Sequence, residues 1–243
     1  MLNTTVWNRW RYSLYAPVYD TVAQRTFARA RRRALNQVCW QSGMKVLLVG
    51  AGTGLDLPWL PRDLEIHASD LCPAMVKRLK DRACRLGIDV EARTMDAERL
   101  DYADNSFDVV VMHLILAVMP DPAKGLAEAH RVLKGDGQLC VMDKFQSDER
   151  PSGLARRGLN LLTSAIATDI TRQARPLLDQ AGFVIEQDTP VMMGSLFRAL
   201  IAAKADHAEP RPAKPRPEEP RPEEPRPAES RPAEPGPTEH QSG

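Results

Sequence analysis

The sequence predicts an α/β protein built around a doubly wound, mostly parallel sheet. Between Met44 and Asp143, apolar strand-like runs alternate five times with helix-like segments, at a spacing of roughly 20–30 residues that is typical of such sheets. The first run leads into a glycine-rich turn, Gly50-Ala-Gly-Thr-Gly54. Glycines allow a tight turn and a close approach of the backbone to a ligand. In doubly wound sheets, ligands bind outside the carboxyl ends of the strands, where this turn lies.

Each predicted element follows from an apolar run and the residues that punctuate it. The five strands are expected over residues 44–49, 64–69, 88–94, 107–117 and 138–143. Helices are expected over residues 18–40, 55–60, 73–86 and 120–133, with Pro73 in a first turn and Gly87 just past an end. Residues 134–137 are predicted as a turn. After a helix that ends at Gly182, residues 183–187 and 196–204 are expected to form an antiparallel hairpin.

The N-terminal segment is rich in aromatic and basic residues. Residues 1–20 hold five of the eight Trp and Tyr residues, and residues 9–33 hold seven arginines against one acid, Asp20. Such a segment can close over a substrate as a flap, or lie on a membrane with its rings at the interface and its arginines on phosphates. Alternatively, the rings simply dock on the core. We predict a helical flap over residues 1–43, with peripheral membrane contact through residues 7–33.

The C-terminal segment has a different composition from the rest of the chain. Arg-Pro-x-x-Pro recurs with a period of five from Arg211 to Pro235, with Ser230 in place of one proline, and eleven of the twenty prolines lie in residues 207–243. A segment with almost no apolar side chains cannot bury a core. We therefore predict a globular domain over residues 44–206, with a helical cap at about 151–182, and a disordered tail over residues 207–243 whose partner is unknown.

Cysteine spacing and hydropathy point to a cytoplasmic protein. Cys39, Cys72, Cys84 and Cys140 show no paired spacing, which argues against a zinc site or a disulfide framework and fits a reducing compartment. The apolar runs are shorter than the roughly 18 residues of a membrane span. We predict a cytoplasmic location, with peripheral contact at the inner membrane face, no metal and no nucleic-acid partner.

Five polar residues lie at the carboxyl ends of the predicted strands or just past them. They are Asp56, Asp70, Asp96, His113 and Asp143. Asp70 comes about 20 residues after the glycines, where an acid can bind a ribose. The spacing Gly-x-Gly-x-Gly, rather than Gly-x-Gly-x-x-Gly, suits a ligand without a pyrophosphate and disfavours a nicotinamide-dependent reductase. Asp96, with Ala97 beside it, could read an adenine amino group.

Together these motifs resemble class I S-adenosylmethionine-dependent methyltransferases over roughly residues 44–145. The matching segments are residues 49–54, Asp70, 95–97, 106–110 and 131–137. The resemblance implies a Rossmann-like seven-stranded methyltransferase sheet with a C-terminal antiparallel hairpin, and S-adenosylmethionine as the cofactor. It also implies the cofactor-binding residues Gly50, Ala51, Gly52, Gly54, Asp56, Asp70, Leu71, Asp96, Ala97 and His113.

A finer resemblance concerns the acceptor. Residues 15–20, 52–58 and 95–98 are similar to bacterial phospholipid N-methyltransferases and to the related quinone C-methyltransferases. This implies a hydrophobic small-molecule or lipid acceptor, with a phospholipid head-group amine as the first choice and a quinone precursor as the alternative.

Three residues are candidates for catalysis. His113 could be the general base, because histidine titrates near neutrality. Its alternative role is that of a hydrogen-bonded core histidine lining the cofactor. Tyr19 could orient the acceptor or cap the cofactor. Asp143 could serve as a base or an amine anchor, or have a structural role.

One position departs from the family pattern. The family usually carries an acid two residues before the first glycine, where it helps to hold the amino-acid end of the cofactor, and this chain has Leu48 there. Asp56 could substitute in part. A rival hypothesis of another class is therefore a non-catalytic adenosylmethionine-binding module whose tail recruits a partner.

The tail prediction can be tested by truncation. Deleting residues 208–243 is expected to leave the thermal unfolding midpoint and the cofactor affinity unchanged, because this composition cannot contribute to a core. Circular dichroism melts and calorimetric titration with S-adenosylhomocysteine measure the two quantities. A lower midpoint for the truncated chain would contradict the assignment of a separate tail.

Overall fold

The computed structural model describes residues 27–145, 174–193 and 196–207. The chain divides into two units, residues 1–210 and 211–243, and all the described residues belong to the first unit. Tyr19, most of the predicted flap, most of the predicted cap and almost all of the predicted tail lie outside the described residues.

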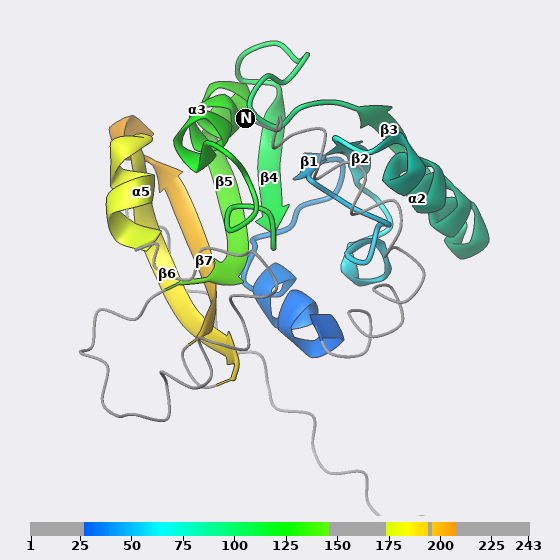
Figure 1. Cartoon of the computed structure of the whole chain (residues 1–243), viewed down its shortest axis with the longest axis horizontal. Helices are drawn as coiled ribbons and strands as arrows, with labels where there is room; N and C mark the ends of the chain where they lie inside the picture. Colours follow the sequence, from blue (N-terminus) through cyan, green and yellow to red (C-terminus); the bar gives the residue numbers. More distant parts are fainter. Residues whose placement is uncertain (1–26, 146–173, 194–195, 208–243) are drawn as a thin grey trace, which may run out of the picture. The chain divides into compact units, whose positions relative to one another are not determined.

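A seven-stranded sheet in the order β3-β2-β1-β4-β5-β7-β6 forms the centre of this unit (Figure 1). Its strands are β1 (Lys45–Val49), β2 (Glu65–Asp70), β3 (Glu91–Thr94), β4 (Phe107–His113), β5 (Leu133–Lys144), β6 (Phe183–Met192) and β7 (Phe197–Lys204). The first five strands pair in parallel. β7 is antiparallel to both β5 and β6. The predicted doubly wound sheet with a C-terminal antiparallel hairpin is thus confirmed.

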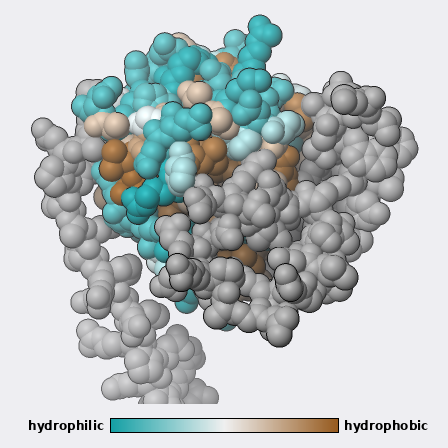
Figure 2. All heavy atoms as spheres, turned by 60° about the vertical axis from the view of Figure 1, so that its left-hand side comes forward, coloured by the Kyte–Doolittle hydropathy of each residue, from teal (hydrophilic) through white to brown (hydrophobic). Residues whose placement is uncertain are grey.

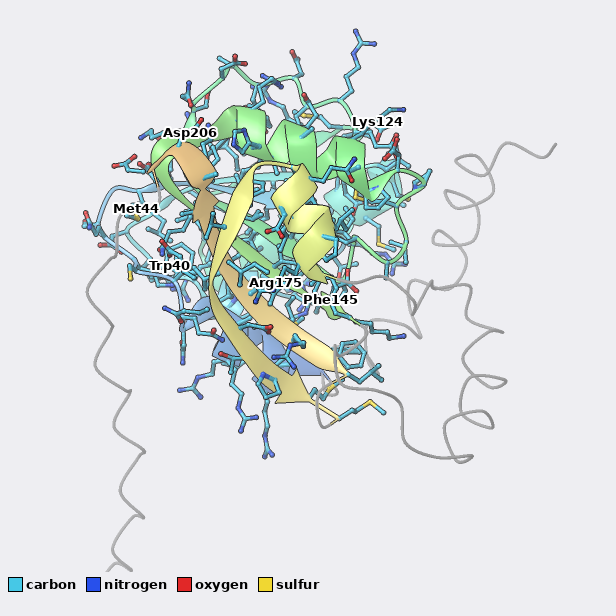
Figure 3. All side chains as sticks on the ribbon, turned by 90° about the vertical axis from the view of Figure 1, so that its left-hand side faces the viewer. Trp40, Met44, Lys124, Phe145, Arg175 and Asp206 are labelled. Atoms are coloured by element: carbon cyan, nitrogen blue, oxygen red, sulfur yellow. The ribbon has the colours of Figure 1, made fainter. Side chains whose placement is uncertain are left out.

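Helices cover both faces of the sheet. The helical residues 27–35 and α2 (Pro73–Leu86) share one apolar core, whereas α3 (Pro122–Val132) and α5 (Ala174–Gln180) share the other. Figure 3 shows α3 and α5 on one side of the β6–β7 pair and the helical residues 27–35 on the other. Because side chains alternate along a strand, Val109 and Val111 of β4 enter the first core and Val110 enters the second. Burial on both faces explains the continuous apolar run of this strand.

The predicted ends of α2 are confirmed. Pro73 occupies the first turn, where a missing N–H is tolerated, and Gly87 follows the last turn with φ 61°. The N–H of Gly87 bonds to the carbonyls of Ala83 and Cys84, which closes the helix.

Three local predictions are wrong. The helix expected to reach Trp40 ends at residue 35, and the indole N–H of Trp40 donates to the Leu35 carbonyl at 2.9 Å. The helix expected over residues 55–60 is the single 3₁₀ turn η1 (Leu57–Trp59). The turn expected over residues 134–137 is a bulge within β5, where pairing moves from Phe107–Leu133 to Val109–Gln138. Bulges and turns use the same residue types, so composition cannot separate them.

β6 also runs further than expected. It continues through Pro190 to Met192, and Pro190 pairs in register with Arg198 of β7. β6 lies at one edge of the sheet. An edge strand tolerates a proline because one row of its N–H groups has no ladder partner.

Candidate active site

The glycine turn follows the central strand β1 and leaves open space beside it. Gly50, Gly52 and Gly54 all adopt the left-handed region, with φ values of 62°, 55° and 77°. The Gly54 N–H closes the turn on the Ala51 carbonyl at 3.0 Å. A Cβ atom at Gly50 would overlap Ile115, whereas a Cβ atom at Gly52 would meet no atom within 4 Å. The turn therefore packs tightly against the loop after β4 at Gly50 and has room for a ligand at Gly52.

Asp70, the last residue of β2, holds this turn. One carboxylate oxygen accepts the Gly52 N–H at 2.8 Å, and the other accepts the Cys72 N–H at 2.9 Å. Burial raises the pKa of Asp70, although the two N–H donors oppose the rise. A carboxylate oxygen has two lone pairs, so each oxygen keeps one acceptor position beyond these bonds. Asp70 can thus orient the turn and still bind two hydroxyl donors.

The other predicted adenosine-site residues lie at the neighbouring strand ends. Leu71 is partly buried and follows β2 directly. Asp96 is exposed two residues after β3, and its carboxylate accepts the Glu98 N–H at 3.0 Å. Ala97 is partly buried against the core that contains α3. Because β1, β2 and β3 are adjacent and parallel, these residues and the glycine turn share one edge of the sheet.

Asp56 belongs to a buried charged network. One of its oxygens lies 2.5 Å from Arg31 Nη1, and the other lies 2.8 Å from His113 Nδ1. Burial alone would raise the pKa of Asp56, but the charges of Arg31 and His113 and their hydrogen bonds outweigh it and hold the pKa well below its usual range. Because the carboxylate is ionised and can only accept, the hydrogen of this bond sits on His113 Nδ1.

The second ring nitrogen of His113 is also engaged. His113 Nε2 lies 3.5 Å from Cys140 Sγ, and burial together with the Asp56 charge raises the pKa of the Cys140 thiol. The thiol thus stays protonated, and its hydrogen is directed at the Ala34 carbonyl, 3.8 Å from Sγ. The base role of His113 stays a prediction, and this arrangement offers it no free ring nitrogen. The geometry matches the alternative role of a hydrogen-bonded core histidine.

Leu48, which stands where the family carries an acid, and Asp56, its possible substitute, are both buried. Leu48 is 1% exposed within the apolar core under the helical residues 27–35. Asp56 is 3% exposed, and each of its oxygens already has a partner. A cofactor contact of Asp56 in place of the missing acid stays a prediction.

Asp143 holds the loop that follows β4. Its carboxylate accepts the Lys144 N–H at 2.7 Å and the Ala117 N–H at 3.1 Å. Burial raises the pKa of Asp143 to about 6, against the effect of these backbone donors. The described contacts are those of a structural residue, and a base or amine-anchor role stays a prediction.

Sequence reasoning missed Arg31 and Cys140. Positions 30, 31, 34 and 35 form the buried face of the helical segment, and Arg31 is the charged residue among them. A charge within an apolar helical stripe signals a buried partner. No comparable signal marks Cys140, which reads as an ordinary core residue.

Comparison with known proteins establishes the family. A family model described as a methyltransferase domain matches residues 47–141. The phosphatidylethanolamine N-methyltransferase of Cereibacter sphaeroides is 30% identical over 187 residues, which cover 75% of this chain and 91% of that protein. The chain belongs to the S-adenosylmethionine-dependent methyltransferases. This methyltransferase therefore uses S-adenosylmethionine as its cofactor.

Other relatives match this methyltransferase over less of their length. The demethylmenaquinone methyltransferase of Renibacterium salmoninarum is 35% identical over 133 residues, covering 53% of this chain and 54% of that protein. The chain thus spans about half of that relative's length.

Two solved structures show the same fold. They are the [4+2]-cyclase SpnF and an S-adenosylmethionine-dependent methyltransferase from Aquifex aeolicus. SpnF has a TM-score of 0.68 at 20% identity and covers 80% of this chain and 94% of its own. The Aquifex structure has a TM-score of 0.54 at 22% identity and covers 72% and 90%.

The environments of Gly50 and Gly52 predict different mutational costs. Both Gly50→Ala and Gly52→Ala place a side chain at positive φ, which costs about 1–2 kcal/mol. Gly50→Ala also overlaps Ile115, and overpacking adds about 1–3 kcal/mol. We expect Gly50→Ala to lower the urea-unfolding free energy clearly more than Gly52→Ala does. Equal losses for the two variants would contradict the tight contact at Gly50.

The buried carboxyl of Asp143 predicts a pH-dependent stability. Its pKa rises from 3.8 to about 6, so the folded protein holds this proton more tightly than the unfolded chain does. The unfolding free energy is therefore expected to fall by about 2 kcal/mol between pH 4 and pH 6.5, relative to an Asp143→Asn variant that does not titrate. Urea unfolding of both proteins at several pH values measures this. A difference that stays constant with pH would refute the shift.

Proposed function

We propose that this methyltransferase transfers its methyl group to the amine of a phospholipid head group. The observation that carries the proposal is the extent of the match to the phosphatidylethanolamine N-methyltransferase, which reaches 91% of that relative. The demethylmenaquinone methyltransferase matches only over about half of each chain. The longer match favours the phospholipid acceptor, because it extends beyond the part of the chain covered by the methyltransferase-domain model.

The surface charge of the helical residues 27–35 supports a phosphate-bearing acceptor. Arg29, Arg32 and Arg33 are exposed, whereas Ala30 and Ala34 between and beside them are buried. The three arginines therefore share one face of the helix. The Arg32 guanidinium also lies 5.8 Å from the Trp59 ring centre. Guanidinium groups bind lipid phosphates well, and each basic residue near an anionic membrane contributes about 1 kcal/mol to binding.

Charge, rather than a broad apolar face, is the membrane-binding feature of the described residues. Figure 2 shows a mostly hydrophilic coloured surface on the α5–β6 side, with hydrophobic residues in small groups. The exposed large hydrophobic residues of the described chain are Val184 and Met193. Within the described ranges, no helix is both long and apolar enough to cross a bilayer. We propose peripheral contact with lipid phosphates through the exposed arginines.

The described residues fit the cofactor at its adenosine end. We propose that the free acceptor positions of Asp70 bind the ribose hydroxyls, that the backbone of residues 50–54 lies along the cofactor, and that Asp96 and Ala97 contact the adenine. The open space at Gly52, next to Asp70, has room for such a ligand. When bound, S-adenosylmethionine supplies an electrophilic methyl group on a sulfonium sulfur. The chain's own contribution is alignment, because correct orientation alone removes much of the barrier to a bimolecular transfer.

We further propose that His113 and Asp143 act by positioning rather than by proton transfer. Both ring nitrogens of His113 have partners, and both carboxylate oxygens of Asp143 hold backbone N–H groups. His113 would then orient Asp56, and Asp143 would hold the loop that packs on Gly50. Tyr19 stays a candidate for orienting the acceptor.

A quinone precursor is the second candidate acceptor, because the demethylmenaquinone methyltransferase is 35% identical over the matched part. The same assay separates the candidates. The full chain is incubated with methyl-labelled S-adenosylmethionine and either vesicles containing phosphatidylethanolamine and an anionic lipid, or detergent-dispersed demethylmenaquinone. We expect label in the phospholipid. Label in the quinone alone would replace the proposed acceptor, and cofactor binding without any product would favour a non-catalytic binding module.

The contribution of Arg29, Arg32 and Arg33 to membrane binding can be tested separately. Replacing Arg29, Arg32 and Arg33 with Gln is expected to weaken binding to the anionic vesicles by about ten- to hundredfold. Replacing Lys77, Lys80 and Arg85 on α2, which are also exposed, removes the same charge from another helix and is expected to change vesicle binding by no more than about twofold. Equal losses in the two triple variants would indicate a general charge effect and contradict a specific lipid-binding face.

A further inference from the structure

Four side chains form a closed ring of polar contacts that starts and ends on the helical residues 27–35. Arg31 pairs with Asp56 at 2.5 Å, and Asp56 pairs with His113 at 2.8 Å. His113 contacts Cys140 at 3.5 Å, and Cys140 Sγ contacts the Ala34 carbonyl at 3.8 Å. The ring thus joins this helix to the segment after the glycine turn, to the end of β4 and to β5.

Stability alone does not account for Arg31 in this ring. Arg31 is 8% exposed and Asp56 is 3% exposed, so both charges have lost most of their hydration. A buried ion pair regains little beyond that desolvation cost. The buried Nε of Arg31 also has no hydrogen-bond partner among the described residues, which adds a further cost. An apolar residue at this position would fill the helix face with less penalty, so folding stability alone does not explain why an arginine stands there.

The ring lies where the two sides of the cofactor site meet. Asp56 follows the glycine turn, and the Leu57 N–H donates back to the Gly54 carbonyl at 3.2 Å. His113 is the last residue of β4, and the next residue, Leu114, adopts a φ of 59°. That conformation is strained for a branched side chain and needs surroundings that enforce it. The Asp56–His113 bond therefore connects the glycine turn to the strained start of the loop that carries Ile115.

We infer that Arg31 is a positioning residue for the cofactor. By holding Asp56 against His113, it fixes the glycine turn relative to the β4 loop and keeps the ring hydrogen of His113 on Nδ1. The inference concerns the cofactor and does not depend on which acceptor is methylated.

The test compares Arg31→Met with Arg31→Lys, and uses Arg85→Met, an exposed arginine near the end of α2, as the matched control. Affinity for S-adenosylhomocysteine is measured by calorimetric titration, well below each variant's unfolding midpoint. The ring ¹⁵N shifts of His113 are measured as well. We expect Arg31→Met to weaken binding by at least about tenfold and to change the ¹⁵N shift of His113 Nδ1, whose bond to Asp56 is then no longer held by Arg31. Arg31→Lys, which can still pair with Asp56, should restore most of the affinity, and Arg85→Met should change neither quantity.

A purely structural role predicts a different result. If Arg31→Met is less stable but binds S-adenosylhomocysteine within twofold of wild type and leaves the His113 ring shifts unchanged, the inference is overturned. If Arg31→Met does not fold, Arg31→Gln, which retains an N–H donor, is measured in the same way. Binding within twofold of wild type together with unchanged His113 ring shifts in that variant would overturn the inference. A wild-type enzyme that binds the cofactor but does not methylate phospholipid would contradict the proposed acceptor and leave this test intact.

Discussion

The position of β1 between β2 and β4 is the constraint on which the site depends. β1 pairs in parallel with both neighbours and is buried on both faces, so its carboxyl end can only continue as a turn at the edge of the sheet. The same pairing brings the ends of β2 and β4 to either side of that turn. Asp70 on one side and the loop after His113 on the other then shape the glycine turn, through a hydrogen bond to Gly52 and through the contact of Ile115 with Gly50.

The acids at the strand ends act mainly on the protein's own backbone. Asp70 accepts the N–H groups of Gly52 and Cys72, and Asp143 accepts those of Ala117, in the loop after β4, and of Lys144, at the end of β5. Buried N–H groups in irregular segments need acceptors, and a carboxylate can satisfy two of them at once. These acids therefore set the shape of the loops, and loops of defined shape align a cofactor without any group that reacts. Such a site is well suited to methyl transfer, in which orientation supplies much of the rate.

Proteins that share this fold do not all catalyse the same reaction. The [4+2]-cyclase SpnF shares the fold with a TM-score of 0.68. The assignment to the methyltransferases comes instead from the relatives that match in sequence, above all one matched over 91% of its length. A fold can host several reactions, so the acceptor has to be inferred from surface charge and from relatives, not from the sheet.

Local signals in the sequence determined much of the fold and part of the site. The parallel sheet follows from the alternation of apolar runs, the limits of α2 follow from Pro73 and Gly87, and the glycine turn with Asp70 follows from spacing along the chain. Only the tertiary structure decided the contacts of Asp56, His113 and Arg31. Arg31 and Asp56 are 25 residues apart, and Asp56 and His113 are 57 residues apart. Whether His113 has a free ring nitrogen depends on which side chains fold against it, and hydrogen-bond partners that distant in the chain leave no periodicity or composition from which to predict them.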